Sequence, residues 1–352
     1  MEYKYYELQN AVYSTWLKDV RCQIMEDFRP LGRAGEGAHG FVFKAMDKKT
    51  HKIVALKKIG FNPNHPMPKN TMREICALKV LKSSNIVELY DIRGVESSVV
   101  LVMEYLPCSL TDVIGFVECP INISQIKTYM KMFLCGVNFM HKNHIMHRDL
   151  KPSNLLISHS GILKIADFGL ARIYKKSDLR TYSHQVATRW YRAPELLYGS
   201  RTYTLKIDIW SVGCILGEML NKKPLFCGET DIEQLAIVLG TLGTPDEEIW
   251  PGVTSLPDYK KISFSHTNPK PWNTVVHGAD ESTLDLVASM LQYNEAERPQ
   301  AEDALSHDFF FVSPRPAPMK EMPPIGKIKM KMNEKLSSFE HVFENFPHSN
   351  LG

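Results

Sequence analysis

The sequence predicts an α+β protein whose strands come first in the chain and whose long helices follow. Residues 41–43 and 53–56 are rich in β-branched and aromatic side chains, which is typical of strands. Residues 124–142 instead repeat apolar side chains at helical spacing, so this segment is expected to be a core helix. With 352 residues, the chain exceeds one small core and is long enough for two lobes.

Composition narrows the class of protein. The chain is 44% apolar with a formal net charge of +3, which does not indicate a binder of polyanions, and no stretch is long enough to span a bilayer. We therefore expect a soluble intracellular enzyme with no nucleic-acid or membrane partner. The 7 cysteines are odd in number, scattered and without metal-site spacing, so they should be reduced thiols. Cys76 and Cys135 should be small core residues, whereas Cys108 is a candidate for solvent access.

The most informative segment is HRDLKPSN at residues 147–154, followed by DFG at residues 167–169. These two motifs, in this order, indicate phosphoryl transfer from ATP. The acceptor hydroxyl must be oriented and must finally lose its proton, and the Asp149 carboxylate is the candidate for that task. Lys151 adds positive charge near the transferring phosphate.

Magnesium is the expected cofactor of this chemistry. Mg²⁺ is a hard cation that prefers oxygen ligands, and Asn154 and Asp167 offer an amide oxygen and a carboxylate at the right places in the two motifs. Gly169 allows the backbone to turn sharply after the second ligand. We therefore predict a magnesium site at Asn154 and Asp167.

A glycine-rich loop precedes the first predicted strand. Its residues are Gly35, Glu36, Gly37, Ala38, His39 and Gly40. The same glycine spacing occurs in dinucleotide-binding folds, but there the glycines open a helix, whereas here strand residues follow. The context favours a loop that covers phosphates with backbone N–H groups.

The strand at residues 53–56 ends in Lys57, which is placed to contact the α- and β-phosphates of ATP and to pair with a glutamate on a helix. Glu74 is the candidate partner, because residues 71–78 have apolar spacing that suits a helix. A solvated surface glutamate is the alternative at this position.

With these segments in place, the chain resembles the eukaryotic protein kinases, and Ala193-Pro194-Glu195 matches the end of the activation segment that begins at Asp167. The resemblance runs from about Met25 to about Phe311. It implies a two-lobed fold with ATP between a small β-rich lobe, about residues 25–104, and a larger, mainly helical lobe, about residues 107–311.

Two terminal segments lie outside that range. Residues 1–24 form an N-terminal extension that is either flexible or packed on the small lobe through its aromatic side chains. Residues 312–352 form a C-terminal tail, proline-rich and then rich in lysine and methionine. The tail is either solvated or docked through a helical apolar face, with these residues: Leu336, Phe339, Val342, Phe343 and Phe346.

Three further segments resemble the cyclin-dependent and mitogen-activated kinases: DFGLAR at 167–172, VATRWYR at 186–192 and LGTP at 242–245. Residues 35–40, 184–188 and 256–259 resemble a divergent, cell-cycle-related branch of the cyclin-dependent kinases. This resemblance implies a serine/threonine kinase acting in cell-cycle or ciliary signalling, with Ser/Thr-Pro sites on protein substrates.

The same resemblance assigns roles within the activation segment. The backbone of residues 186–188 and the side chain of Arg192 would shape a pocket for the proline after the target residue, and Thr188 would link Asp149 to Lys151. A purely structural loop is the alternative for these residues.

Activation by phosphorylation is also expected. Ser183 matches the position that the family phosphorylates, and Arg73, Arg148 and Arg172 match its arginine cluster. A phosphate carries about −1.5 to −2 charges, which bidentate arginines can clamp to order the loop. An upstream activating kinase would then be a partner. In the alternative, Ser183 is an ordinary loop hydroxyl and the arginines form separate surface pairs.

For adenine, the resemblance implies recognition at residues 100–106, a buried strand that runs into the connection between lobes. Met103 would lie behind the adenine pocket, and Glu104 and Leu106 would offer backbone hydrogen bonds. The pocket would be lined by these residues: Val42, Ala55 and Leu156. A plain core strand is the alternative.

Three residues have structural roles in the family. Asp208 matches the aspartate that braces the catalytic-loop backbone, and Glu195 and Arg298 match a buried ion pair. Removing one partner of such a pair typically costs about 3–5 kcal/mol, because the other charge is left alone.

The sequence also departs from the cyclin-dependent pattern. Ala38 and His39 replace a Thr-Tyr pair whose phosphorylation inhibits many relatives, so that switch should be absent. The helix of Glu74 lacks the usual cyclin-binding string, which leaves open a cyclin, another activating subunit or none.

Two function classes remain, an active kinase and a nucleotide-binding scaffold, and the intact set of Lys57, Asp149, Asn154 and Asp167 favours activity. A conventional cyclin-dependent or mitogen-activated kinase is the second reading among enzymes. The resemblance suggests the nucleus and cytoplasm, and also the cilium.

Overall fold

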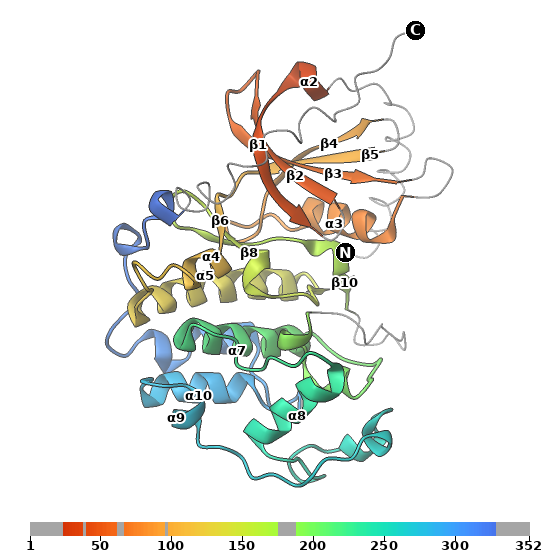
Figure 1. The fold of residues 1–352 in the computed structure, drawn as a ribbon, viewed down its shortest axis with the longest axis vertical. Coiled ribbons are helices and arrows are strands. Elements are labelled where there is room, and N and C mark those ends of the chain that lie inside the picture. The colour runs from red at the N-terminus through yellow and green to blue at the C-terminus, as the bar shows by residue number, and fades with distance from the viewer. Residues whose placement is uncertain (1–23, 38–39, 62–66, 96–97, 175–187, 329–352) are drawn as a thin grey trace.

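A small, strand-rich lobe lies on a larger helical lobe (Figure 1). The computed structural model describes residues 24–37, 40–61, 67–95, 98–174 and 188–328. The predicted α+β class and the two-lobed arrangement are confirmed. Within the described residues, no helix is both long enough and apolar enough to cross a membrane.

The small lobe contains one antiparallel sheet with the strand order β1-β2-β3-β5-β4. Its strands are β1 Phe28–Gly37, β2 Gly40–Asp47, β3 Ile53–Gly60, β4 Leu89–Val95 and β5 Ser98–Glu104. The short helix α2, Ile24–Asp27, precedes β1. β1 and β2 pair antiparallel from Phe28 with Asp47 to Gly37 with Gly40, so the described residues of the glycine-rich loop belong to these two strands.

The two faces of this sheet bury different side chains, because successive residues of a strand point to opposite faces. On β3, Val54 and Leu56 belong to a small outer cluster with Phe43, whereas Ala55 and Ile59 belong to the main core. The helix α3, Lys69–Val80, contributes its buried residues to the same main core. Lys57 follows Ala55 by two residues and therefore shares its face.

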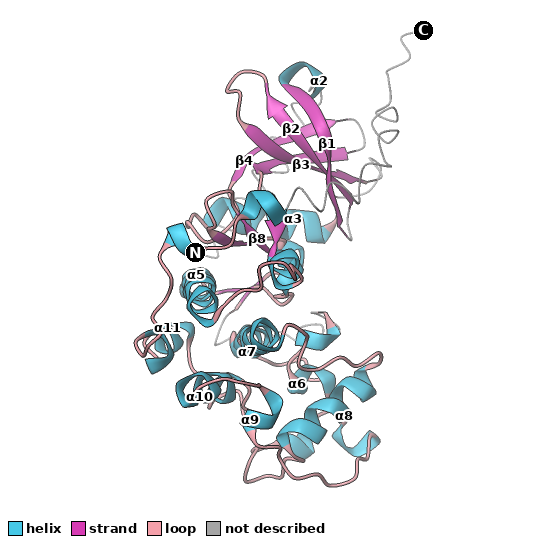
Figure 2. Ribbon diagram, turned by 60° about the vertical axis from the view of Figure 1, so that its left-hand side comes forward, coloured by secondary structure: helices cyan, strands magenta, loops and turns pink. Residues whose placement is uncertain are grey.

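The larger lobe is helical. Its helices are α4 Leu110–Ile114, α5 Ile123–Lys142, α6 Pro194–Leu197, α7 Lys206–Asn221, α8 Asp231–Leu242, α9 Trp272–Val275, α10 Glu281–Met290 and α11 Ala301–Leu305. In both views α5, α7 and α10 follow one another in that order away from the small lobe (Figures 1 and 2). Asn122 caps α5, because its side chain accepts from the N–H of Gln125 while the Gln125 side chain accepts from the N–H of Asn122.

Short strands place the catalytic segments over α5. They are β6 Cys108–Ser109, β7 Ile145–Met146, β8 Leu155–Ile157, β9 Leu163–Ile165 and β10 Arg172–Ile173. β8 pairs with both β6 and β9, and β7 pairs with β10. A Cβ at Gly136 of α5 would lie 2.8 Å from Ile165 and 2.9 Å from the Asn85 carbonyl oxygen, so glycine permits this close packing.

After Phe311, residues 312–328 form a C-terminal segment that runs along the larger lobe. Ala317 donates its N–H to the Ser124 carbonyl, and its own carbonyl accepts from the Thr128 hydroxyl at 2.8 Å. Met322, Ile325 and Ile328 are buried in the main core. Residues 312–328 therefore pack on the larger lobe, which neither reading of the tail specified. The stripe predicted between Leu336 and Phe346 and residues 1–23 of the N-terminal extension lie outside the described residues.

The cysteines correct one expectation. Cys76 and Cys108 are both buried, at 0% and 4% exposure, and Cys135 is half-buried. Burial raises the pKa of the Cys108 thiol to about 12 and that of Cys76 to about 11. The expectation that Cys108 is a candidate for solvent access was wrong, because β6 places it against β8 in the core.

Candidate active site

A buried ion pair joins the small-lobe sheet to α3. The Lys57 Nζ atom lies 2.8 Å from both carboxylate oxygens of Glu74 and 3.4 Å from the Asp167 carboxylate. Burial on its own lowers the pKa of Lys57, but the charges of Glu74 and Asp167 raise it above its ordinary value. Lys57 is therefore a fixed positive charge, and the alternative of a solvated Glu74 does not hold, since that residue is 3% exposed.

Asp149 is held on both of its oxygens. Oδ1 accepts from the N–H of Thr188 at 2.9 Å and from its hydroxyl at 3.1 Å. Oδ2 lies 3.0 Å from the Lys151 ammonium and 3.1 Å from the Asn154 amide nitrogen. Lys151 also donates to the Thr188 hydroxyl at 2.8 Å, so Thr188 contacts both Asp149 and Lys151. This arrangement fixes the carboxylate in one orientation at the end of the catalytic loop.

Asp208, in the first turn of α7, braces the backbone of this loop. Its two oxygens accept from the N–H groups of His147 and Arg148, each at 2.9 Å, and Oδ2 also contacts His141 at 2.9 Å. Burial by itself raises the pKa of Asp208, but the His141 side chain and the backbone N–H of Arg148 hold it below its ordinary value. Asp208 therefore stays ionised inside the protein and orients the peptide groups just before Asp149.

His147 links the catalytic loop to the residue before Asp167. His147 accepts from the N–H of Asp149 through Nδ1, and its Nε2 lies 3.0 Å from the carbonyl oxygen of Ala166, the neighbour of Asp167. Asp167 itself has a left-handed backbone with φ 61°. For a residue other than glycine, this conformation is costly and is characteristic of functional sites.

The donor chemistry at Asn154 and Asp167 fits Mg²⁺. The Asn154 amide nitrogen donates to the carbonyl and to the carboxylate of Asp149, which leaves the amide oxygen as the end available to a cation. In the described part of the chain, no three His, Cys, Asp or Glu side chains gather as a metal cage. A site with few protein ligands suits Mg²⁺, which keeps water and phosphate oxygens around itself.

The residues predicted to contact adenine lie where the lobes join. Ala55 pairs with Met103 across β3 and β5, and both are buried, as is Leu106. Val42 on β2 and Leu156 on β8 are half-buried and pack against the main core. The N–H of Glu104 donates to the Glu88 carbonyl at 2.9 Å. The Glu104 side chain lies 2.6 Å from Lys164 of β9, which ties the connection between lobes to the strand before Asp167.

Some predicted site residues fall outside the described residues. These are Ala38 and His39 of the glycine-rich loop, Ser183, and positions 186 and 187 of the substrate pocket. Of the rest of the loop, the backbone pairs Gly35 with Val42, Glu36 with Phe41 and Gly37 with Gly40.

The three arginines predicted to clamp a phosphate lie on different elements. Arg148 is buried, and its guanidinium donates to the Leu170 carbonyl and to the Tyr203 hydroxyl. Arg73 on α3 donates to Asn70 of the same helix, and Arg172 lies on β10 beside β7. The three arginines therefore lie in the catalytic loop, on α3 and on β10. Ser183, whose phosphate they would bind, is outside the described residues.

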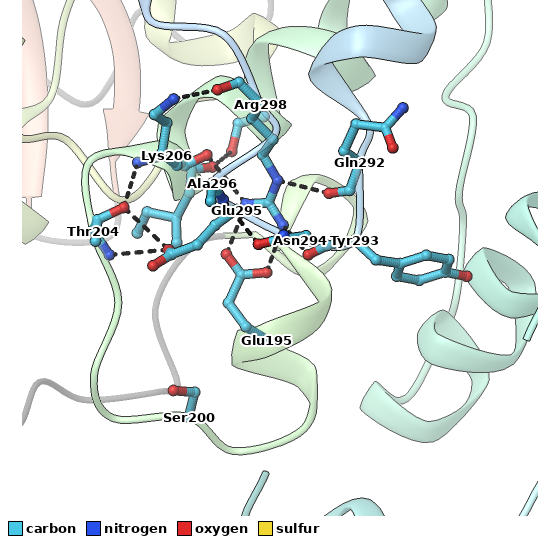
Figure 3. Close-up of polar contacts among 12 residues, drawn as sticks. Glu195, Ser200, Thr204, Lys206, Gln292, Tyr293, Asn294, Glu295, Ala296 and Arg298 are labelled. Carbon is cyan, nitrogen blue, oxygen red and sulfur yellow. Dashed lines mark hydrogen bonds and ion pairs between the residues drawn. The ribbon is translucent and has the colours of Figure 1, made fainter. Parts of the chain in front are cut away.

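Glu195 and Arg298 form the buried pair that the resemblance implies (Figure 3). Both contacts between the guanidinium and the carboxylate are 2.7 Å long. Arg298 also donates to the carbonyl groups of Gln292, Lys206 and Tyr293. The pair therefore fixes the end of the activation segment to the segment before α11.

Several residues around the site were not predicted. His141 contacts Asp208 from the last turn of α5, and Tyr203 receives a hydrogen bond from Arg148. Asp231 of α8 accepts from Arg192 at 2.9 Å and from Arg189 at 2.7 Å. Each contact joins positions that are far apart in the sequence and outside any local motif, so linear spacing gave no signal for them.

The chain is similar in sequence to known proteins. The protein kinase domain family matches residues 28–310. Cyclin-dependent kinase 20 of Danio rerio is 50% identical over 301 residues, which is 85% of this chain and 88% of that protein. The protein of the same name from Homo sapiens is 48% identical over 301 residues, 85% of this chain and 87% of its own length.

A solved structure is also similar. It is described as the CAK complex from Chaetomium thermophilum bound to ATP-gamma-S. The matched chain has a TM-score of 0.79 and 32% sequence identity, and the match covers 85% of this chain and 95% of that chain.

Proposed function

The chain belongs to the protein kinase family and is a serine/threonine kinase of the cyclin-dependent kinase family, and we propose that it phosphorylates serine or threonine residues followed by proline. The Asp149 carboxylate held by Thr188 and Lys151 supports phosphoryl transfer. The observation that carries the proline preference is the buried Arg192 guanidinium, which Asp231 holds at 2.9 Å. The scaffold alternative is not favoured, because Lys57, Asp149, Asn154 and Asp167 are all present and gathered in one site.

In the proposed reaction, Asp149 orients the acceptor hydroxyl and finally takes its proton. The hydroxyl oxygen forms a bond to the γ-phosphorus of ATP while the bond from that phosphorus to the bridging oxygen breaks, and ADP leaves with that oxygen. Lys151, which contacts Oδ2 of Asp149 and the Thr188 hydroxyl, supplies positive charge beside the transferring group.

ATP use follows from the family, and we propose where this chain holds the nucleotide. Lys57 would contact the α- and β-phosphates, with its position fixed by Glu74. Adenine would lie between Ala55 and Leu156. Because the N–H of Glu104 already donates to Glu88, Glu104 would contact adenine through its carbonyl oxygen, and Leu106 through its backbone.

We propose that Asn154 and Asp167 hold Mg²⁺ through the amide oxygen and the carboxylate. When bound, the ion would neutralise charge on the phosphates and help to orient them. The hydrogen bonds from the Asn154 amide nitrogen to Asp149 support this assignment, because they set the direction of the amide oxygen.

We also propose that phosphorylation and an activating subunit regulate the kinase. Phosphate on Ser183 would meet the cluster of Arg73, Arg148 and Arg172 and order the activation segment. The similarity to a chain from a solved complex supports an activating subunit, a cyclin or another protein. We place the protein in the nucleus and cytoplasm, with the cilium as a further site, which imaging of the tagged full chain would check.

The test of the proposed function is peptide phosphorylation by the purified full chain with ATP and Mg²⁺. Peptides would be matched in pairs that differ only in Pro or Ala after the target serine, and Asp149→Asn would serve as the blank. Preferential transfer to the Ser-Pro peptides is the expected result. Equal transfer to both members of each pair would contradict proline direction, while transfer no higher than the blank would count against an enzyme that acts alone.

A further inference from the structure

Glu295 lies in the segment between α10 and α11, beside the start of α7. One oxygen of its carboxylate accepts two hydrogen bonds from Thr204, from the backbone N–H at 3.3 Å and from the hydroxyl at 3.0 Å (Figure 3). The Thr204 hydroxyl oxygen in turn accepts from the N–H of Lys206 at 3.2 Å. Because the hydroxyl proton points to Glu295, the oxygen lone pairs are directed to the first turn of α7.

Thr204 lies in a segment that contacts the catalytic loop at three points. Its carbonyl accepts from the N–H of Ile207, which opens the helix. Three residues before the first residue of the helix, the Tyr203 hydroxyl accepts from the Arg148 guanidinium at 2.9 Å. Within the first turn, Asp208 accepts from the N–H groups of His147 and Arg148. Residues 203–208 are therefore the support against which the peptide groups before Asp149 are oriented.

The surroundings of Glu295 carry charge from several elements. Burial raises the pKa of Glu295, the negative charge of Glu195 on α6 raises it further, and Arg298 and Thr204 act in the opposite direction. The negative charge of Glu295 acts to raise the pKa of Lys206 on α7, against the larger effect of burial. Burial and the charge of Glu295 both raise the pKa of Tyr174, which follows β10. The Glu295 carboxylate contacts the start of α7 through its two hydrogen bonds with Thr204, so its effect on this helix passes through them.

We infer that Glu295 is a positioning residue for phosphoryl transfer, which acts through Thr204 to fix the start of α7 and thereby the catalytic loop. The inference rests on the kinase activity stated above. Among the described residues, the Glu295 carboxylate bonds to Thr204 and to none of the predicted nucleotide contacts, so its loss should change the rate of the chemical step and leave the binding of ATP nearly unchanged.

The experiment uses the full chain and five variants: Glu295→Ala, Thr204→Val, Thr204→Ser, the double variant Glu295→Ala with Thr204→Val, and the control Glu297→Gln on an exposed residue nearby. Steady-state kinetics on a peptide substrate would give kcat and the KM for ATP. Hydrogen–deuterium exchange over residues 145–155 would report on the catalytic loop without any turnover, with β3 as an internal reference.

We expect kcat to fall at least about fivefold for Glu295→Ala and for Thr204→Val, with the KM for ATP within about twofold of wild type. Thr204→Ser should retain most activity, since it keeps the hydroxyl. The double variant should be no worse than either single variant, because both remove the same link. Exchange should increase in the catalytic loop and not in β3.

Two results would overturn the inference. One is catalytic-loop exchange in Glu295→Ala and Thr204→Val equal to that in Glu297→Gln. The other is additive losses in the double variant. The exchange measurement needs no activity. An inactive wild-type chain would therefore count against the proposed function, and the exchange data would still test whether Glu295 and Thr204 hold the catalytic loop.

Discussion

The Lys57 ammonium and the Glu74 carboxylate meet at 2.8 Å through both oxygens, and neither side chain is more than 8% exposed. Burial makes each charge costly unless the other is present. The pair therefore couples the position of α3 to β3. Asp167, 3.4 Å from the same ammonium, extends the coupling to the larger lobe, so three separate segments share one charge network.

Replacing Glu74 by Gln should uncouple α3 from the nucleotide site. The amide keeps the shape of the carboxylate but removes its charge, so Lys57 should move toward Asp167. We expect kcat/KM on a peptide substrate to fall by at least about tenfold, or roughly 1.4 kcal/mol. Glu88→Gln, on an exposed residue of the same lobe, is the matched control. Wild-type kinetics in Glu74→Gln would show that the pair has no part in turnover.

Asp208→Asn should reveal a pH-dependent contribution to stability. The pKa of Asp208 is lowered in the folded protein, so its contribution is present above its ordinary value of 3.8 and is lost as the pH falls through the folded pKa. At neutral pH the variant should lose roughly 2–3 kcal/mol of unfolding free energy, because its side chain accepts fewer hydrogen bonds. Below about pH 4 the gap should narrow, since protonated Asp and Asn are both neutral.

Urea unfolding of wild type and Asp208→Asn, from about pH 3 to pH 7, measures this gap directly. A difference that stays constant over the whole range would mean that the charge of Asp208 does not support the fold.

The sequence identified the site where its residues lie in short linear motifs. Asp149, Asn154 and Asp167 stand at fixed spacings that the chemistry requires, and the structure brings them together. It did not reveal His141 or Glu295, whose contacts join positions 67 and 91 residues apart. Such contacts depend on how helices pack, and local spacing contains no information about that packing.

Local reasoning also failed for burial. Cys108 lies next to the connection between lobes, and that position suggested a solvent-exposed thiol. The two residues of β6 instead pair with β8, and this pairing buries Cys108. The position of residues 312–328 was not predicted either, because the docked reading of the tail concerned the apolar residues between Leu336 and Phe346. Side chains on the first turns of α5 hold this segment by donating hydrogen bonds to its backbone carbonyls, and the donors are Gln125, Lys127 and Thr128.

Thiol labelling should separate the cysteines by burial. At neutral pH, Cys119 and Cys227 are exposed and should react first with a maleimide. Cys76 and Cys108 should stay unlabelled until the protein unfolds, because burial raises their pKa to about 11 and about 12 and removes the thiolate. Peptide mapping after short exposure would check this order, and early labelling of Cys108 would contradict its place in the core.

Truncating Ile325 should show that the C-terminal segment is part of the folded lobe. Ile325 is 3% exposed and packs in the main core, so Ile325→Ala should lower the free energy of unfolding by about 2–4 kcal/mol. Met319 in the same segment is 42% exposed, and Met319→Ala is the matched control, with an expected change within about 0.5 kcal/mol. Urea unfolding of the full chain measures both.

If the segment only rested on the surface, the two variants would be equally stable. The hydrogen bonds argue otherwise, because Thr128 and Gln125 donate to the carbonyls of Ala317 and Glu321 at 2.8 Å and 2.6 Å. Each of these two hydrogen bonds contributes about 0.5–1.5 kcal/mol to holding the segment on α5. The Ile325→Ala variant should therefore retain the segment in place and lose stability through the cavity alone.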